Sequence, residues 1–122
     1  MRYVLCVVGV AVAALVPRAS AAQEPDTAVA TSAAITAGRA VYHGAGTCAT
    51  CHGANLEGAV GPALTAHSWK DAKGGSYAAI LDVVTKGVHG TAMPPRAGGI
   101  SDAEARQVAA YVWAVSQSKT KP

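Results

Sequence analysis

Two cysteines and a histidine stand together near the middle of the sequence, in the pentapeptide Cys48-Ala49-Thr50-Cys51-His52. The two residues between the cysteines bend the backbone so that both thiols face the same way, and the imidazole follows directly. This C-x-x-C-H pattern is the attachment signature of c-type haem: the thiols add to the two vinyl groups and the imidazole binds the iron. We therefore expect Cys48 and Cys51 to hold one haem c covalently, with His52 as an iron ligand.

Three other interpretations of the cysteine pair are open at this point. A structural disulfide suits an exported protein but leaves His52 without a role. A thioredoxin-like redox pair requires a βαβ setting, and no segment has the pattern of a strand. A structural zinc site requires four ligands, and the remaining histidines, His43, His67 and His89, lack the spacing of a second ligand pair.

The first 21 residues have the order of a secretory signal peptide. A basic start precedes an apolar run of 14 residues, 3–16, and small residues occupy the A-x-A positions 19–21. The run is shorter than the roughly 20 residues of a membrane-spanning helix, which favours cleavage over a retained anchor. We expect cleavage after Ala21 or Ala22 and a periplasmic location.

Removal of residues 1–21 leaves 101 residues and lowers the formal charge from +3 to +1, because Arg2 and Arg18 are lost. The chain has no Phe and is rich in Ala and Gly, so its own side chains would bury little apolar area per residue. A large apolar cofactor would complete such a core. The lysines and arginines are not clustered, which argues against nucleic-acid binding.

Hydrophobic spacing predicts three helices joined by Gly- and Pro-rich loops, at 32–43, 77–86 and 102–116. The second helix has Ser76 as its N-cap, and the third begins with the capping box Ser101–Glu104. The expected fold class is all-α. The expected organisation is a signal peptide at 1–21, a flexible leader at 22–31, a haem-binding domain at 32–118 and a tail at 119–122.

A second axial ligand is expected from the loop that follows the second helix. Met93 is the only methionine left after loss of Met1, and Pro94 and Pro95 stiffen the chain beside it. Six-coordinate iron changes little in geometry between its redox states, and a thioether ligand raises the reduction potential. His89, four residues earlier, is the alternative ligand. An open distal site that binds gases or reacts with peroxide is a further alternative.

Five short motifs follow one another in the order Gly38-x-x-x-Tyr42, Cys48-Ala49-Thr50-Cys51-His52-Gly53, Gly61-Pro62-Ala63-Leu64, Ala92-Met93-Pro94-Pro95 and Tyr111-Val112-Trp113. This order resembles the class I monohaem cytochromes c. It is similar to soluble bacterial carriers and to the haem domains of cbb3-type oxidases and alcohol dehydrogenases. The resemblance covers residues 32–118, and its most specific part is the C-x-x-C-H motif.

The resemblance implies a role for each of these motifs. The Pro62 carbonyl would accept a hydrogen bond from His52, although an ordinary Gly-Pro turn is the alternative when the motif is taken alone. Leu64 would pack on the haem. Together with Cys48, Cys51 and Met93, these residues form the expected cofactor site.

The resemblance also implies contacts outside the ligand set. Gly38 and Tyr42 would lie where the first helix crosses the last, near Tyr111. Trp69 and Tyr77 lie where the family often places hydrogen-bond donors to a haem propionate, and simple amphipathic packing is the alternative for both.

These expectations describe a periplasmic single-electron carrier that performs no substrate chemistry of its own. It would take electrons from a dehydrogenase or a bc1-type complex and pass them to a terminal oxidase or another acceptor, meeting membranes only through these partners. One alternative is a haem subunit bound permanently to a quinoprotein dehydrogenase or an oxidase. The other is the gas-binding or peroxide-reactive sensor.

Overall fold

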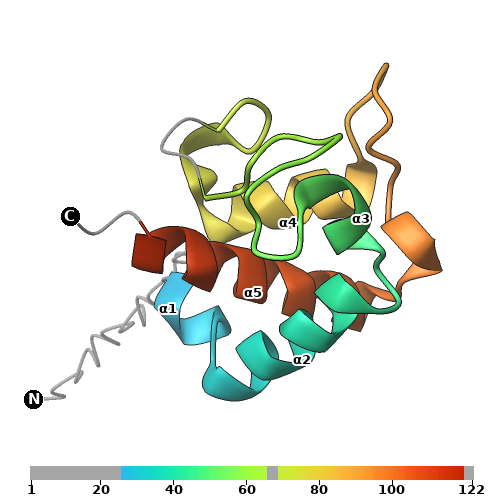
Figure 1. Cartoon of the computed structure of the whole chain (residues 1–122). Coiled ribbons are helices and arrows are strands. Elements are labelled where there is room, and N and C mark those ends of the chain that lie inside the picture. Colours follow the sequence, from blue (N-terminus) through green and yellow to red (C-terminus); the bar gives the residue numbers. More distant parts are fainter. Residues whose placement is uncertain (1–25, 66–68, 120–122) are drawn as a thin grey trace, which may run out of the picture.

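The computed structural model describes residues 26–65 and 69–119 (Figure 1). Within these ranges the chain forms helices and no strand, which confirms the predicted all-α class. The helices are α1 Asp26–Val29, α2 Ser32–His43, α3 Cys48–His52, η1 Lys73–Gly75, α4 Tyr77–Lys86, η2 Ala97–Gly99 and α5 Asp102–Lys119. The predicted signal peptide, residues 1–21, lies outside the described residues, as does His67.

The helices α2 and α4 have the bounds that the sequence predicts, and a hydroxyl caps each N-terminus. The Thr31 hydroxyl accepts the backbone N–H of Ala34 at 3.2 Å. The Ser76 hydroxyl accepts the N–H of Ala79 at the same distance, as its predicted capping role requires. Each such bond satisfies one N–H that has no partner within the helix, and a cap of this kind contributes about 1 kcal/mol.

The predicted capping box begins α5. The N–H of Ser101 donates to the Glu104 carboxylate at 2.8 Å, and the Ser101 hydroxyl accepts the N–H of Glu104 at 3.2 Å. The hydrogen bonds from Ser101 hold the pKa of the Glu104 carboxyl below its usual value. The helix continues to Lys119 rather than ending at 116 as predicted. Ser116, the last residue of the predicted helix, is buried, whereas Gln117 and Ser118 beyond it are exposed.

The segment before α2 differs from the predicted flexible leader. Residues 26–29 form the short helix α1. The side chains of Val29 and Ala30 are partly buried and pack against the core. A helix of four residues is too short to show a hydrophobic period, so only its contact with the rest of the chain reveals it.

Gly38 lies where α2 crosses α5 and permits a close approach of the two helices. A Cβ atom at this position would lie 1.9 Å from the Gln107 carbonyl oxygen and 2.9 Å from the Cβ of Tyr111. Next to this contact, the Tyr42 and Tyr111 rings meet edge to face with centroids 5.5 Å apart. The crossing implied for Gly38, Tyr42 and Tyr111 is therefore present.

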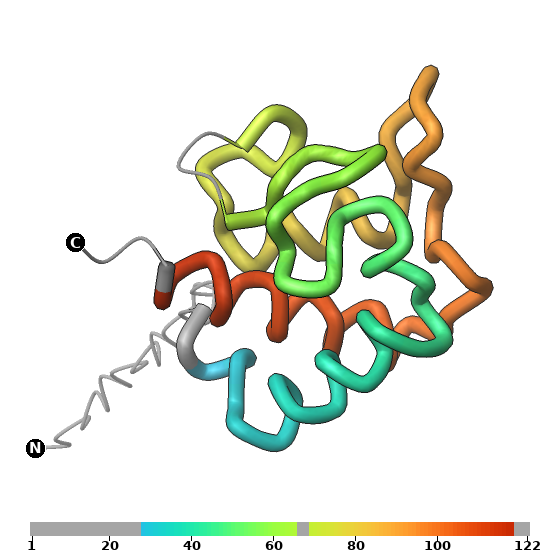
Figure 2. The backbone as a smooth tube through the Cα atoms, viewed as in Figure 1, coloured from blue at the N-terminus to red at the C-terminus, as the bar shows by residue number. Residues whose placement is uncertain are grey.

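Helix α5 runs through the middle of the domain, with α2 on one side and α4 on the other (Figure 1). The long connections 53–65 and 87–101 lie on the same side as α4 (Figure 2). Four alanines belong to the buried core of the described residues, and its larger side chains include Val41, Tyr42, Leu56, Ile80, Ile100 and Val108. Among the helices of the described ranges, none has the length and apolar character needed to cross a membrane.

Candidate haem site

The short helix α3 presents the two thiols and the imidazole of the C-x-x-C-H motif. It begins after Thr47, which has a left-handed backbone conformation (φ 52°), and ends at Gly53 (φ 83°). Cys48 and Cys51 are not joined to each other and are partly exposed. Both thiols line the same cavity, and burial raises the pKa of the Cys48 thiol.

This cavity has a volume of about 490 Å³ and lies between α3, α4, α5 and the loops on their side of the domain. That volume is in the range of cofactor pockets, which are mostly apolar with a few polar groups. Its wall is mainly aliphatic, with Leu64, Ile80, Val83, Val84, Val108 and Val112 among the lining residues. A wall of this chemistry, with two thiols at its edge, fits a large flat apolar group attached through sulfur.

The imidazole of His52 is held in one orientation by the loop that faces it. Its Nδ1 lies 2.8 Å from the Pro62 carbonyl oxygen. Because a carbonyl can only accept a hydrogen bond, Nδ1 must carry the proton, and the lone pair of Nε2 is then available for a metal. The side chain is only 8% exposed, and a Cβ on Gly61 would lie 2.9 Å from its Cε1.

Two backbone hydrogen bonds hold the loop that contains Pro62 against α3. The N–H of Gly61 donates to the Cys51 carbonyl at 2.7 Å, and the N–H of Gly58 donates to the His52 carbonyl at 2.8 Å. The loop that carries the Pro62 carbonyl is thus held directly against the C-x-x-C-H motif by hydrogen bonds. Leu64, which the family resemblance places on the haem, also lines the cavity.

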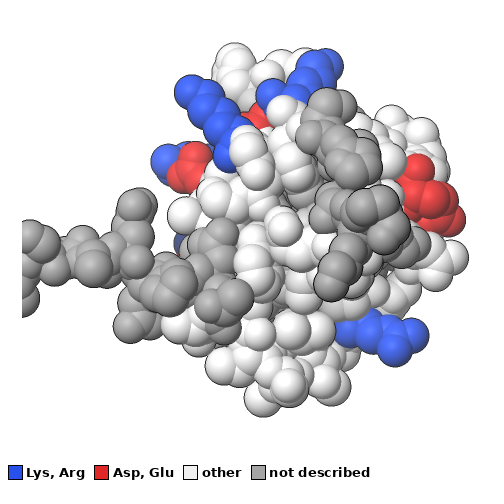
Figure 3. All heavy atoms as spheres, turned by 90° about the vertical axis from the view of Figure 1, so that its left-hand side faces the viewer, with Lys and Arg blue, Asp and Glu red and all other residues white. Residues whose placement is uncertain are grey.

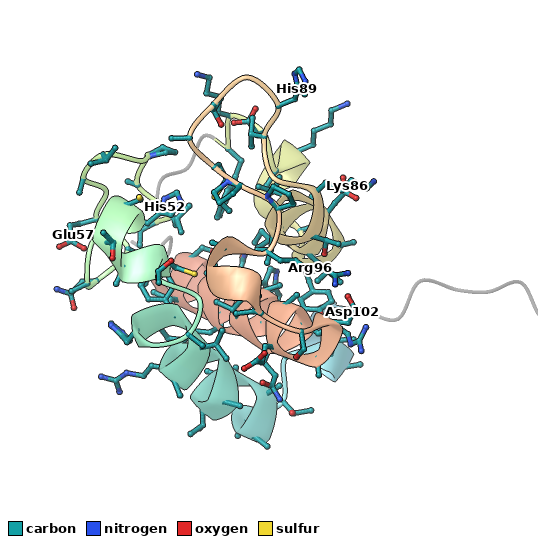
Figure 4. The ribbon with its side chains drawn as sticks, turned by 90° about the vertical axis from the view of Figure 1, so that its right-hand side faces the viewer. His52, Glu57, Lys86, His89, Arg96 and Asp102 are labelled. Atoms are coloured by element: carbon teal, nitrogen blue, oxygen red, sulfur yellow. The ribbon has the colours of Figure 1, made fainter. Side chains whose placement is uncertain are left out.

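Met93 lines this same cavity from the loop between α4 and α5. His89, the alternative ligand, is exposed at the tip of that loop and does not line the cavity. Figure 4 shows His89 at the far end of the loop, well away from His52. His43 is exposed at the end of α2, where its ring packs near those of Tyr42 and Tyr111. The structure therefore brings Met93, and neither of these histidines, to the cavity.

The two aromatic residues suggested as propionate donors differ in position. Trp69 lines the cavity. Tyr77 does not: its hydroxyl lies 3.4 Å from the Arg106 carbonyl of α5, and burial raises its pKa. These contacts favour the alternative of simple packing for Tyr77. As the first residue of α4, it joins that helix to α5.

Tyr42 and Thr91 line the cavity, a role that the sequence did not predict for either of them. The Tyr42 side chain, expected only at the helix crossing, also lines the cavity, and its hydroxyl donates to the Gly53 carbonyl at 2.7 Å. Burial raises its pKa. Thr91 lines the cavity beside Met93. The only sequence signal for this role of Thr91 is that its hydroxyl stands two positions before the candidate ligand Met93.

The alternative of a zinc site finds no ligand set in residues 26–65 and 69–119. There, no group of three or more His, Cys, Asp or Glu side chains gathers at one point. A structural zinc site is built from four such ligands. Two thiols beside an oriented imidazole and a thioether, around an apolar cavity, instead fit what a c-type haem requires: two attachment points and two candidate iron ligands.

Comparison with known proteins assigns the class. Residues 33–112 match the family model described as cytochrome c oxidase, cbb3-type, subunit III. The chain belongs to this family and is a class I c-type cytochrome, an electron-transfer domain with one covalently attached haem c and its iron. The family resemblance proposed from the sequence motifs is thereby confirmed.

Individual relatives agree with this class. FixPc of Rhizobium leguminosarum bv. viciae, described as a cbb3-type cytochrome c oxidase subunit, is 36% identical over 84 residues. Those residues are 62% of this chain but only 29% of FixPc. The chain thus corresponds to less than a third of that curated relative.

Solved structures include two similar c-type cytochromes. Cytochrome cL of Methylophaga aminisulfidivorans is 26% identical with a TM-score of 0.60, and the match covers 69% of this chain and 54% of that one. Cytochrome c6 of the diatom Phaeodactylum tricornutum is 32% identical with a TM-score of 0.59. That match covers 70% of this chain and 97% of the diatom protein, so nearly the whole of a c6 structure is represented here.

Proposed function

We propose that this chain is an exported single-electron carrier whose haem iron is bound by His52 and Met93. One observation carries the proposal: a single apolar cavity is lined by the two thiols, by the oriented imidazole and by the Met93 side chain. The signal-peptide pattern of residues 1–21 supports export to the periplasm. The donor would be a dehydrogenase or a bc1-type complex, and the acceptor a terminal oxidase or a similar protein.

Each part of the site has a task in this function. When bound, the haem supplies an iron that gains and loses one electron. Cys48 and Cys51 anchor the group covalently, and the Pro62 carbonyl orients His52 toward the iron. The thioether of Met93 favours the ferrous state and so raises the reduction potential. The aliphatic wall excludes water and lowers the local dielectric constant, and we propose no substrate chemistry at this site.

Replacement of Met93 by alanine tests this ligand assignment. We expect the near-infrared charge-transfer band of the ferric protein to disappear and the reduction potential to fall, because the thioether is lost. The matched control is His89→Ala, which removes a donor from the same loop but from outside the cavity and should leave both measurements unchanged. A band that survives in Met93→Ala, or disappears in His89→Ala, would contradict the assignment.

We propose that electrostatic attraction contributes little to the docking of a redox partner, because charges on the described surface are paired or scattered. Lys86 is paired with Asp82, and Arg96 with Asp102. On the face seen in Figure 3 the charged side chains are scattered and of both signs. A rim residue of the cavity is instead apolar: Val60 is 83% exposed. Lys70 and Asp71 also line the cavity and are exposed, so a partner would meet charges of both signs beside apolar side chains.

A permanent haem subunit is the second candidate, because FixPc and the matching family are both described as parts of cbb3-type oxidases. Size-exclusion chromatography of the mature holoprotein, alone and mixed with a purified dehydrogenase or oxidase, separates the two functions. A carrier should elute as a separate monomer in every mixture, since transient electron-transfer complexes are weak. Stable co-elution with one partner would instead establish the subunit and overturn the free carrier.

A further inference from the structure

The loop that bears Met93 is tied to the end of α4 by backbone hydrogen bonds. The N–H of Val88 donates to the Met93 carbonyl at 3.0 Å, and the N–H of Arg96 donates to the Val84 carbonyl at 2.9 Å. Gly87, with φ 68°, turns the chain out of α4, and a Cβ there would lie 2.6 Å from the Met93 carbonyl oxygen. The backbone of the ligand-bearing loop thus closes on itself within a few residues.

One side chain completes this closure. The Thr91 hydroxyl donates to the Val88 carbonyl at 2.8 Å and accepts the N–H of Met93 at 3.2 Å. It therefore links the start of the loop to the residue that carries the thioether. The next two residues, Pro94 and Pro95, have no N–H, so the N–H of Met93 is the last amide donor before Arg96.

A methionine sulfur is a weak ligand, so its share of time on the iron depends on how well the protein holds it in place. If the loop opens, water or an added base takes the position. An interaction that exists only in the closed loop shifts the equilibrium between the closed and the open loop by its own free energy. The two hydrogen bonds of the Thr91 hydroxyl hold the shape of the 88–93 turn, and they are lost when that turn unfolds to release the thioether.

We propose that Thr91 is a positioning residue for the distal ligand: its hydroxyl holds the 88–93 turn closed and so keeps the Met93 thioether at the cavity. Thr91 lines the cavity beside Met93, at the distal side of the site. This inference rests on the proposed function, because it requires Met93 to be the sixth ligand. It predicts that the hydroxyl, rather than the size of the side chain, sets the stability of the closed loop.

Competition with added imidazole on the ferric holoprotein measures that stability. In Thr91→Val, which keeps the shape but removes both hydrogen bonds, we expect the apparent imidazole affinity to rise about threefold to tenfold, the effect of one net hydrogen bond. The near-infrared band should weaken at the same time. Thr91→Ser retains the hydroxyl and should bind imidazole within about twofold of the wild type.

Two further variants separate this inference from the assignment on which it rests. In the Met93→Ala background, where no thioether competes, Thr91→Val should leave imidazole affinity unchanged. An equal rise in both backgrounds would mean that Thr91 acts on the cavity directly, which would overturn the positioning role. If Met93→Ala itself leaves the near-infrared band and imidazole affinity as in the wild type, the ligand assignment is wrong and the inference fails with it.

Global unfolding in denaturant distinguishes positioning from a general structural role. Because the two hydrogen bonds of Thr91 are absent from the unfolded chain as well as from the open loop, Thr91→Val should lower the free energy of unfolding by about the free-energy equivalent of its rise in imidazole affinity, and by no more. Wild-type imidazole affinity in Thr91→Val would refute the proposal. A fall in the free energy of unfolding clearly larger than the free-energy equivalent of the rise in imidazole affinity would refute it too, because the hydroxyl would then be supporting more of the domain than the loop.

Discussion

Replacement of both Cys48 and Cys51 by alanine should abolish covalent haem attachment. The two thiols lie on one short helix and line one cavity, so each can form one thioether bond with the same group. Each single replacement should leave one bond, whereas the double variant leaves none. The measurement is haem-dependent staining of the protein after denaturing electrophoresis, which retains only covalently held haem.

The double variant should also lose most of its folding stability. The cavity measures about 490 Å³. At about 24 cal/mol per Å³, leaving it empty would cost up to about 12 kcal/mol, an upper bound because water can enter the open side. This is comparable with the 5–15 kcal/mol by which whole domains are stable. With haem retained only by its axial ligands, we expect partial loss of haem and reduced helical circular dichroism.

Cys6→Ala is the matched control for this experiment. That residue belongs to the predicted signal peptide and should be absent from the mature protein. Both staining and helicity should therefore equal those of the wild type. Retention of covalent haem by the Cys48→Ala/Cys51→Ala variant would show that attachment occurs elsewhere and would remove the basis of the site.

The second large effect is expected from Gly38→Ala, at the crossing of α2 and α5. Helix propensity alone would favour alanine over glycine by about 1 kcal/mol. The added Cβ would, however, lie 1.9 Å from the Gln107 carbonyl oxygen, which is backbone and cannot rotate away. Overpacking of this kind costs about 1–3 kcal/mol, and the propensity gain offsets about 1 kcal/mol of it, so we expect a net loss of up to about 2 kcal/mol and a lower unfolding midpoint.

Ala40→Gly provides the comparison within the same helix, because Ala40 is exposed. There, only propensity acts, and the variant should lose about 1 kcal/mol. One substitution adds a methyl group and the other removes one, yet both should lower the free energy of unfolding. Denaturant unfolding of the two holoproteins measures this. If Gly38→Ala were as stable as the wild type or more stable, the close approach of α2 and α5 would be refuted.

Features that depend on neighbours in the sequence were predictable. The bounds of α2 and α4, the Ser76 cap and the Ser101–Glu104 capping box all follow from residues within one or two helical turns. The cofactor class was equally local, because five consecutive residues specify two thiols and an imidazole. Such patterns reflect backbone geometry and side-chain chemistry that act over a few residues, and both are written directly in the sequence.

Features that depend on contacts between distant segments required the tertiary structure. The sequence left His89 open as an alternative to Met93 for the second axial ligand. Only the path of the loop places Met93 at the cavity and His89 at an exposed tip. Tyr77 pairs with a carbonyl of α5, 29 positions away. The packing of Val29 against the core has the same origin.

The sequence by itself thus determined the three main helices, the caps at Ser76 and Ser101, and the chemistry of the attachment motif. The tertiary structure decided which side chains share the cavity, how closely α2 approaches α5, and that the hydroxyl of Thr91 links Val88 to Met93. The physical reason is that burial and hydrogen bonding between remote segments arise only when the chain folds, and no short pattern of residues encodes them.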